Sequence, residues 1–218
     1  ALTSQLIANW LKLQREELAI RFQTLPEKIQ AAKSTADEER PVLRARLNEE
    51  EISEAEKTKT DSRLCMIDYF CNKCDQLIDI AQSDGKSKLA KHIFAREQQQ
   101  FRQALPMYAR KSEFLEMIRT SGALVLKGGT GIGKSVTVPQ WLRDEFIEKG
   151  KKDAKIAVLV PRKSIAMGLG GYIASVRGCT LGDPGAEVGY AVGGDVKMGN
   201  LCFMTYGFFK AISTSDPL

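Results

Sequence analysis

An eight-residue segment near the middle of the chain has the composition of a phosphate-binding loop. Residues 128–135 read Gly-Gly-Thr-Gly-Ile-Gly-Lys-Ser and fit the pattern G-x-x-x-x-G-K-[ST]. Glycines let backbone N–H groups approach a triphosphate without a Cβ in the way, and a helix N-terminus directs further N–H groups at the anion. The predicted nucleotide-binding residues are Gly128, Gly129, Thr130, Gly131, Ile132, Gly133, Lys134 and Ser135.

Two side chains of this loop are expected to do the chemistry. Lys134 would reach the β- and γ-phosphates, and the Ser135 hydroxyl would bind Mg²⁺, so we predict Lys134 and Ser135 as the catalytic pair. The alternative is a glycine-rich turn that happens to precede a Lys-Ser pair. An apolar run before the loop and a helical pattern after it favour the nucleotide site.

The elements around the loop are those that such a site requires. Short apolar runs alternate with helical patterns after Pro106, which predicts an α/β fold with a parallel sheet, as in one half of a doubly wound nucleotide-binding domain. The predicted strands are Leu124–Leu126, Ile156–Val160, Val188–Ala191 and Leu201–Thr205. The predicted helices are Ser135–Lys149, Lys163–Val176 and one that begins near Phe208.

The residues before 120 are predicted to be almost entirely helical. Apolar residues from Leu2 to Phe22 recur at helical spacing, and Pro26 interrupts them. The charged stretch 27–61 suits a solvated helix or one arm of a helical hairpin, with a disordered linker or a coiled coil as alternatives. Pro41 is expected to start a second helical segment within it.

Composition and charge limit the classes of protein that the chain can belong to. The net charge of +5 lies in the half with the loop, because residues 1–109 hold 17 basic and 17 acidic side chains. A mildly basic surface suits a polyanion or merely aids solubility. No segment approaches the ~20 apolar residues of a membrane span. Five cysteines without a framework spacing favour a reducing compartment, cytoplasmic or nuclear.

One pair of cysteines has the spacing of half a zinc site. Cys71 and Cys74 are spaced C-x-x-C, with Cys65 before them and His92 after them. Structural zinc typically needs four ligands in two short pairs. A single pair within a predicted helix favours two thiols that line a buried helix face, and zinc remains the alternative.

Five segments that follow one another resemble those of DEAH/RHA-type superfamily 2 helicases, whose loop typically reads G-E-T-G-S-G-K-[ST]-T-Q-V-P-Q. The resemblance covers about residues 101–210, roughly half of the chain. The segments are the lead-in at 101–118, the loop with Pro139-Gln140, Pro161-Arg162-Lys163, Val188-Gly189-Tyr190, and Thr205-Tyr206-Gly207.

The resemblance implies an incomplete first RecA-like, ATP-binding domain at residues 106–218, preceded by an all-helical region at 1–105 for which we find no family resemblance. It implies ATP and Mg²⁺ as cofactors and an ATP-dependent RNA helicase as the intact protein. The helical region would pack on the core or recruit a protein partner. No membrane contact is expected.

The resemblance also implies roles for four residues outside the loop. Arg162, Lys163 and Thr205 match segments that grip the backbone of single-stranded RNA; a solvated arginine and a strand-end hydroxyl are the alternatives. Tyr172 stands where many relatives have an arginine that stacks on adenine, and its ring could still stack.

The sequence departs from the family at several positions. Gly129 replaces a glutamate, Ile132 a small residue and Lys163 an arginine. The D-E-x-H segment, expected roughly twenty residues after Thr205-Tyr206-Gly207, does not occur before Leu218. Because its carboxylates position Mg²⁺ and the attacking water, we expect this chain alone to bind nucleotide weakly if at all and to have no useful ATPase or unwinding rate. The alternative function is a non-hydrolysing, nucleotide-gated RNA-binding or regulatory module built on a degenerate helicase domain.

Overall fold

The structure is a computed structural model that describes residues 24–49, 51–83, 86–182 and 185–215. It divides the chain into two compact units, Ala1–Ala104 and Leu105–Leu218. The helix predicted over Leu2–Phe22 lies outside the described residues.

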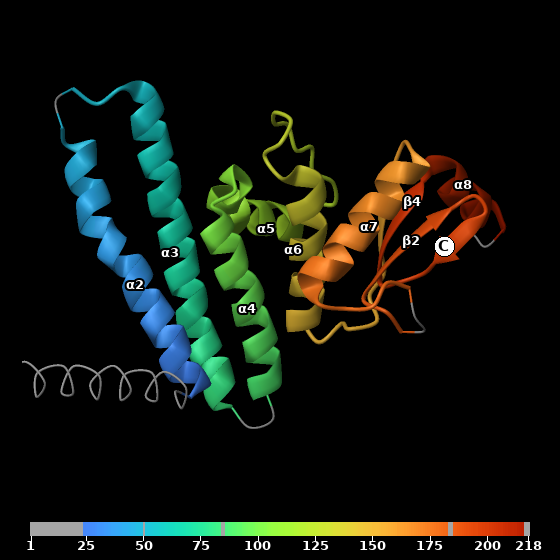
Figure 1. The fold of residues 1–218 in the computed structure, drawn as a ribbon, viewed down its shortest axis with the longest axis horizontal. Helices are drawn as coiled ribbons and strands as arrows, with labels where there is room; N and C mark the ends of the chain where they lie inside the picture. Colours follow the sequence, from blue (N-terminus) through green and yellow to red (C-terminus); the bar gives the residue numbers. More distant parts are fainter. Residues whose placement is uncertain (1–23, 50, 84–85, 183–184, 216–218) are drawn as a thin grey trace, which may run out of the picture. The chain divides into compact units, whose positions relative to one another are not determined.

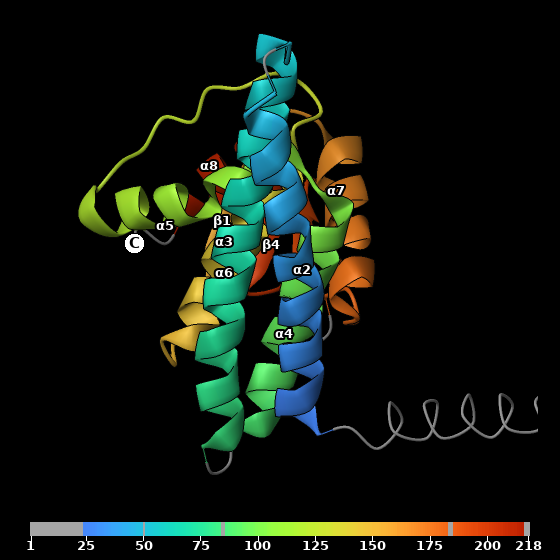
Figure 2. The same cartoon turned by 90° about the vertical axis from the view of Figure 1, so that its left-hand side faces the viewer.

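The described part of the first unit is helical, as predicted. Helices α2 (Leu25–Leu47) and α3 (Glu54–Gln82) form a hairpin, and α4 (Ser87–Gln103) packs along α3 (Figures 1 and 2). Capping boxes start the first two helices, at Thr24 with Glu27 and at Ser53 with Glu56. Each box satisfies two backbone N–H groups that a helix start leaves without partners.

The charged stretch is one arm of this hairpin, but the predicted break at Pro41 is wrong. Helix α2 runs through Pro41 without interruption. An interior proline costs about 3 kcal/mol, and burial of Ile29 and Ala36 together with ion pairs to α3 offsets that cost. The pairs across the hairpin are Lys33–Asp75 (2.6 Å), Glu39–Arg63 (2.8 Å), Arg40–Asp68 and Arg46–Glu56 (3.4 Å).

The core of the first unit is built on aromatic rings and thiols. The Phe70 and Phe101 rings stack with centroids 4.4 Å apart, and the Arg63 guanidinium lies 4.2 Å from the centroid of Phe101. Cys71 and Cys74 are buried on α3, as the helix-face interpretation expects. Among the residues described, no group of three or more His, Cys, Asp or Glu is arranged to hold a metal ion.

The second unit is an α/β domain, which confirms the predicted fold class. A 3₁₀ turn, η1 (Pro106–Arg110), and α5 (Lys111–Thr120) precede the loop. The elements that follow are α6 (Lys134–Glu148), β1 (Ile156–Val160), α7 (Lys163–Arg177), β2 (Val188–Val192), β3 (Asp195–Lys197), β4 (Leu201–Thr205) and α8 (Tyr206–Ser215).

The sheet has the strand order β1-β4-β2-β3. Strands β1, β4 and β2 are parallel, with Ile156 and Val188 both opposite Leu201, whereas β3 turns back antiparallel to β2. Alternate residues of β4 face opposite sides of the sheet. Phe203 packs in the cluster that α7 covers with Ile173. Met204 packs in a second cluster, with Phe208 of α8.

The strand predicted directly before the loop is wrong. Residues 122–129 have no strand pairing, and Val125 is 93% exposed. A strand needs a neighbour for its backbone N–H and C=O groups. The described residues offer none to this segment, since the named strands pair only with one another. Its β-propensity alone does not create a strand.

None of the helices in the described part of the chain is long and apolar enough to cross a bilayer.

Candidate nucleotide-binding site

The glycine loop adopts a conformation that depends on its glycines. Gly131 and Gly133 have φ of +86° and +97°, a region that L side chains rarely adopt. Gly133 is the N-cap of α6, and its carbonyl accepts from the N–H groups of Val136 (3.2 Å) and Thr137 (2.7 Å). The loop therefore leads into a helix N-terminus, as an anion site requires.

The Lys134 ammonium closes the loop on itself. Its Nζ donates to the carbonyl oxygens of Gly128 and Gly129, both at 2.6 Å. These bonds bring a positive charge to the first two glycines of the loop, six and five residues earlier in the chain. Ser135, the residue predicted to bind Mg²⁺, is exposed in the first turn of α6.

The Pro-Gln pair after the loop has a structural role in α6. Pro139 is buried inside the helix, and Gln140 is 4% exposed. The Gln140 Nε2 donates to the Val136 carbonyl at 2.8 Å. This buried amide therefore braces the first turns of the helix that carries Lys134.

Sequence reasoning missed Thr137, whose side chain explains the glycine at 133. Thr137 is 3% exposed, and its Oγ1 would lie 2.8 Å from a Cβ placed on Gly133. Any larger residue at 133 would collide with this hydroxyl. The available signal was the i, i+4 spacing of Gly133 and Thr137 across the first turn of α6.

The predicted RNA-binding residues lie at one edge of the sheet. Val160 and Thr205 are paired at the ends of β1 and β4. Arg162 follows β1 as the exposed N-cap of α7. The Lys163 Nζ donates to the Gly193 carbonyl at 2.7 Å, so Lys163 also fastens the turn between β2 and β3. Because β1 and β4 are parallel, these residues all lie at the carboxyl ends of the strands.

Tyr172 lies apart from that edge. It is on α7, nine residues after Lys163, which is about 13 Å along a helix, and it is 49% exposed. Its ring is therefore accessible to a ligand on the outer side of α7, away from the ends of the strands.

The fold and the loop together define the class: a partial RecA-like α/β domain with a glycine loop directly before α6. No family profile matches the chain. A protein named as a DEAH-box ATP-dependent helicase of Mycosarcoma maydis is 34% identical over 112 residues, which are 48% of this chain and 7% of that protein. The ATP-dependent DNA/RNA helicase DHX36 of Bos taurus is 30% identical over 151 residues, 67% of this chain and 15% of DHX36.

A third relative covers more of the chain. The protein of Anopheles gambiae named as ATP-dependent RNA helicase spindle-E is 30% identical over 175 residues, 80% of this chain and 12% of spindle-E. The chain belongs to the DEAH-type superfamily 2 helicases. It spans 7–15% of the length of these relatives.

The comparison with spindle-E corrects one expectation about the helical region. An alignment over 80% of the chain is longer than the second unit, Leu105–Leu218. It therefore extends into the helical unit, for which the motifs alone gave no resemblance. Helix patterns hide such a relationship because they fix spacing and polarity rather than the identity of residues.

Proposed function

We propose that the second unit binds ATP with Mg²⁺ through residues 128–135, as the ATP-binding domain of an RNA helicase. The observation that carries the proposal is the position of Lys134, whose Nζ lies 2.6 Å from two loop carbonyls at the start of α6. An incoming triphosphate would exchange these two neutral acceptors for negatively charged oxygens, so that the hydrogen bonds of the ammonium would gain the attraction between opposite charges.

Mg²⁺ would complete the charge balance of this site. It binds through few protein ligands and substrate phosphates, and it keeps several waters. The exposed Ser135 hydroxyl supplies one such ligand directly after Lys134. The described loop residues include no carboxylate, so the phosphates themselves would provide most of the negative charge around the ion.

We propose further that single-stranded RNA lies along the carboxyl ends of β1 and β4. Arg162 is exposed there, and Thr205 ends the neighbouring strand. Contacts of this kind hold the sugar-phosphate backbone and give affinity without sequence preference. Two relatives are named as an RNA helicase and a DNA/RNA helicase, which supports this assignment.

The nucleotide proposal is tested by isothermal titration of the chain with MgATP. We expect binding to wild type and its loss in Lys134→Ala, with Lys127→Ala as a matched control, because Lys127 is an exposed lysine just before the loop. Equal affinity of wild type and Lys134→Ala would refute the proposal. For RNA, Arg162→Ala should weaken binding of fluorescent oligouridylate and oligoadenylate by a similar factor.

A further inference from the structure

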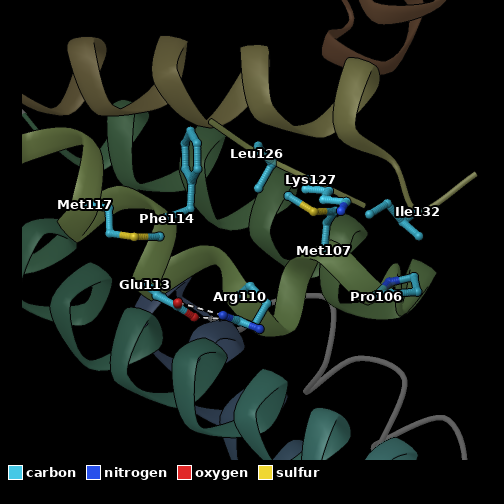
Figure 3. Close-up of a pocket in the computed structure, with 9 residues that line it drawn as sticks. All are labelled: Pro106, Met107, Arg110, Glu113, Phe114, Met117, Leu126, Lys127 and Ile132. Carbon is cyan, nitrogen blue, oxygen red and sulfur yellow. Dashed lines mark hydrogen bonds and ion pairs between the residues drawn. The ribbon is translucent and has the colours of Figure 1, made fainter. Parts of the chain in front are cut away.

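Ile132 lines a cavity beside the loop. The cavity has a volume of about 220 Å³ and lies between the loop, η1 and α5 (Figure 3). Its apolar walls come from Pro106 and Met107 of η1, Phe114 of α5 and Leu126 before the loop. The apolar side chain of Ile132 thus lies among apolar neighbours. Glycine or serine at this position would leave those neighbours without an apolar partner.

The same side chain covers the first glycine of the loop. A Cβ on Gly128 would lie 2.4 Å from Ile132 Cδ1 and 3.8 Å from Lys134 Nζ. Ile132 therefore reaches across the loop to the residue whose carbonyl holds the Lys134 ammonium. Movement of Ile132 would release Gly128 and, with it, one of the two bonds that orient Lys134.

A second contact supports the other end of the loop. Leu105 directly precedes η1, and its Cδ1 would lie 3.4 Å from a Cβ on Gly133. Leu105 thus lies beside the loop at Gly133, and the next two residues, Pro106 and Met107, line the same cavity as Ile132. Both contacts lie within the second unit.

We propose that Ile132 is a positioning residue for the nucleotide, which anchors the glycine loop against η1 before the phosphates arrive. The inference rests on the proposed nucleotide binding. A glycine loop loses much conformational entropy when it is ordered. If the free protein already holds the loop in order, binding does not have to supply that free energy, and the affinity is higher. Ile132 would supply this order through its apolar side chain, which lines one cavity with Pro106 and Met107 of η1.

The experiment compares Ile132→Ser, Ile132→Val and Val125→Ser by titration with MgATP and with magnesium tripolyphosphate. We expect Ile132→Ser to raise both Kd values by about tenfold, because the anchor acts on the phosphate cradle alone. Ile132→Val keeps most of the apolar surface and should restore most of the affinity. Val125→Ser, at a position 93% exposed, should bind like wild type.

Amide hydrogen exchange of the ligand-free chain gives a readout that does not depend on binding. Residues 128–133 should exchange faster in Ile132→Ser than in wild type, whereas peptides from the sheet should not change. Unchanged exchange and unchanged Kd in Ile132→Ser would overturn the inference and leave the nucleotide site intact, provided Lys134→Ala still abolishes binding. Failure of wild type to bind MgATP would overturn both.

Discussion

The side chain of Arg177, at the end of α7, is completely buried and donates from Nη2 to Asp144 Oδ1 of α6 at 2.9 Å. Its Nε also donates to Glu187, which directly precedes β2, at 3.0 Å. Burial disfavours the guanidinium charge, but the two carboxylates raise the pKa of Arg177 above its usual value. This cluster joins the helix of the nucleotide loop to α7 and to the sheet.

Breaking this cluster should strongly destabilise the second unit. Removal of one partner from a buried ion pair typically costs about 3–5 kcal/mol, because the other charge is left buried. We expect Asp144→Ala to lower the free energy of unfolding by that amount. The measurement is urea denaturation followed by the fluorescence of Trp141, which is buried on α6, in a Trp10→Phe background.

An exposed ion pair provides the control for this prediction. Glu116 lies 3.6 Å from Arg119 and its side chain is 69% exposed. Because exposed pairs are worth about 0–1 kcal/mol, Glu116→Ala should change the urea midpoint little. A similar loss of stability in both variants would show that the buried cluster contributes no more to stability than an exposed ion pair does.

Most of the α/β fold could be predicted from residues because three of its named strands, β1, β2 and β4, are short apolar runs. Ile156–Val160 and Leu201–Thr205 were predicted with the bounds observed, and α7 was predicted to within one residue. Strand β3 was missed, since Asp195–Lys197 is three residues long and follows a Gly-Gly turn. The segment 124–126 has the same composition as a strand but no described neighbour, and pairing is a property of the whole sheet.

The residues of the candidate site could be predicted from the sequence, but the residues that pack against the loop could not. The loop pattern specifies Lys134 and Ser135 because phosphate chemistry requires those groups at that spacing. The pattern carries no information about Leu105, which lies directly before η1, or about Thr137 of α6, although both lie beside Gly133 of the loop. The contact of Leu105 arises from packing, which no local spacing encodes, whereas the only signal for Thr137 is its i, i+4 spacing from Gly133.

Glu145 should make stability depend on pH in the acid range. Hydrogen bonds from Arg119, 2.9 Å away across α5 and α6, lower the pKa of Glu145 to about 2 against the opposing effect of burial, and Lys149 adds to the lowering. A carboxyl with a lowered folded pKa adds stability above its unfolded value of 4.5. That stability is lost as the pH falls from 4.5 towards 2.

The test compares wild type and Glu145→Gln by urea denaturation at pH 7, 5, 4 and 3. The variant should be less stable at pH 7 and pH 5, and the difference should shrink at pH 4 and again at pH 3. A difference that stays constant over this range would mean that the Glu145 charge contributes nothing to stability.

The cysteines should differ in their reaction with iodoacetamide. Cys65 is exposed, whereas Cys71, Cys74 and Cys202 are buried. Burial raises the pKa of the Cys74 thiol to about 12, and the thiolate is the reactive form. Mass spectrometry of the native chain at pH 7.5 should find Cys65 alkylated first and Cys74 last. Equal rates in the native chain would contradict the burial of Cys74 on α3, and equal rates in urea serve as the control.

Tyr172 should contribute to binding of the nucleotide base and not to binding of the phosphates. Stacking of a base on an aromatic ring is worth about 1–3 kcal/mol, and the lower value corresponds to about a fivefold change in Kd. Tyr172→Ala should therefore weaken MgATP binding about fivefold, Tyr172→Phe should bind like wild type, and magnesium tripolyphosphate should bind all three equally. This pattern is the opposite of that expected for Ile132→Ser, which weakens both ligands. An unchanged Kd for MgATP in Tyr172→Ala would show that the exposed ring on α7 takes no part in binding the base.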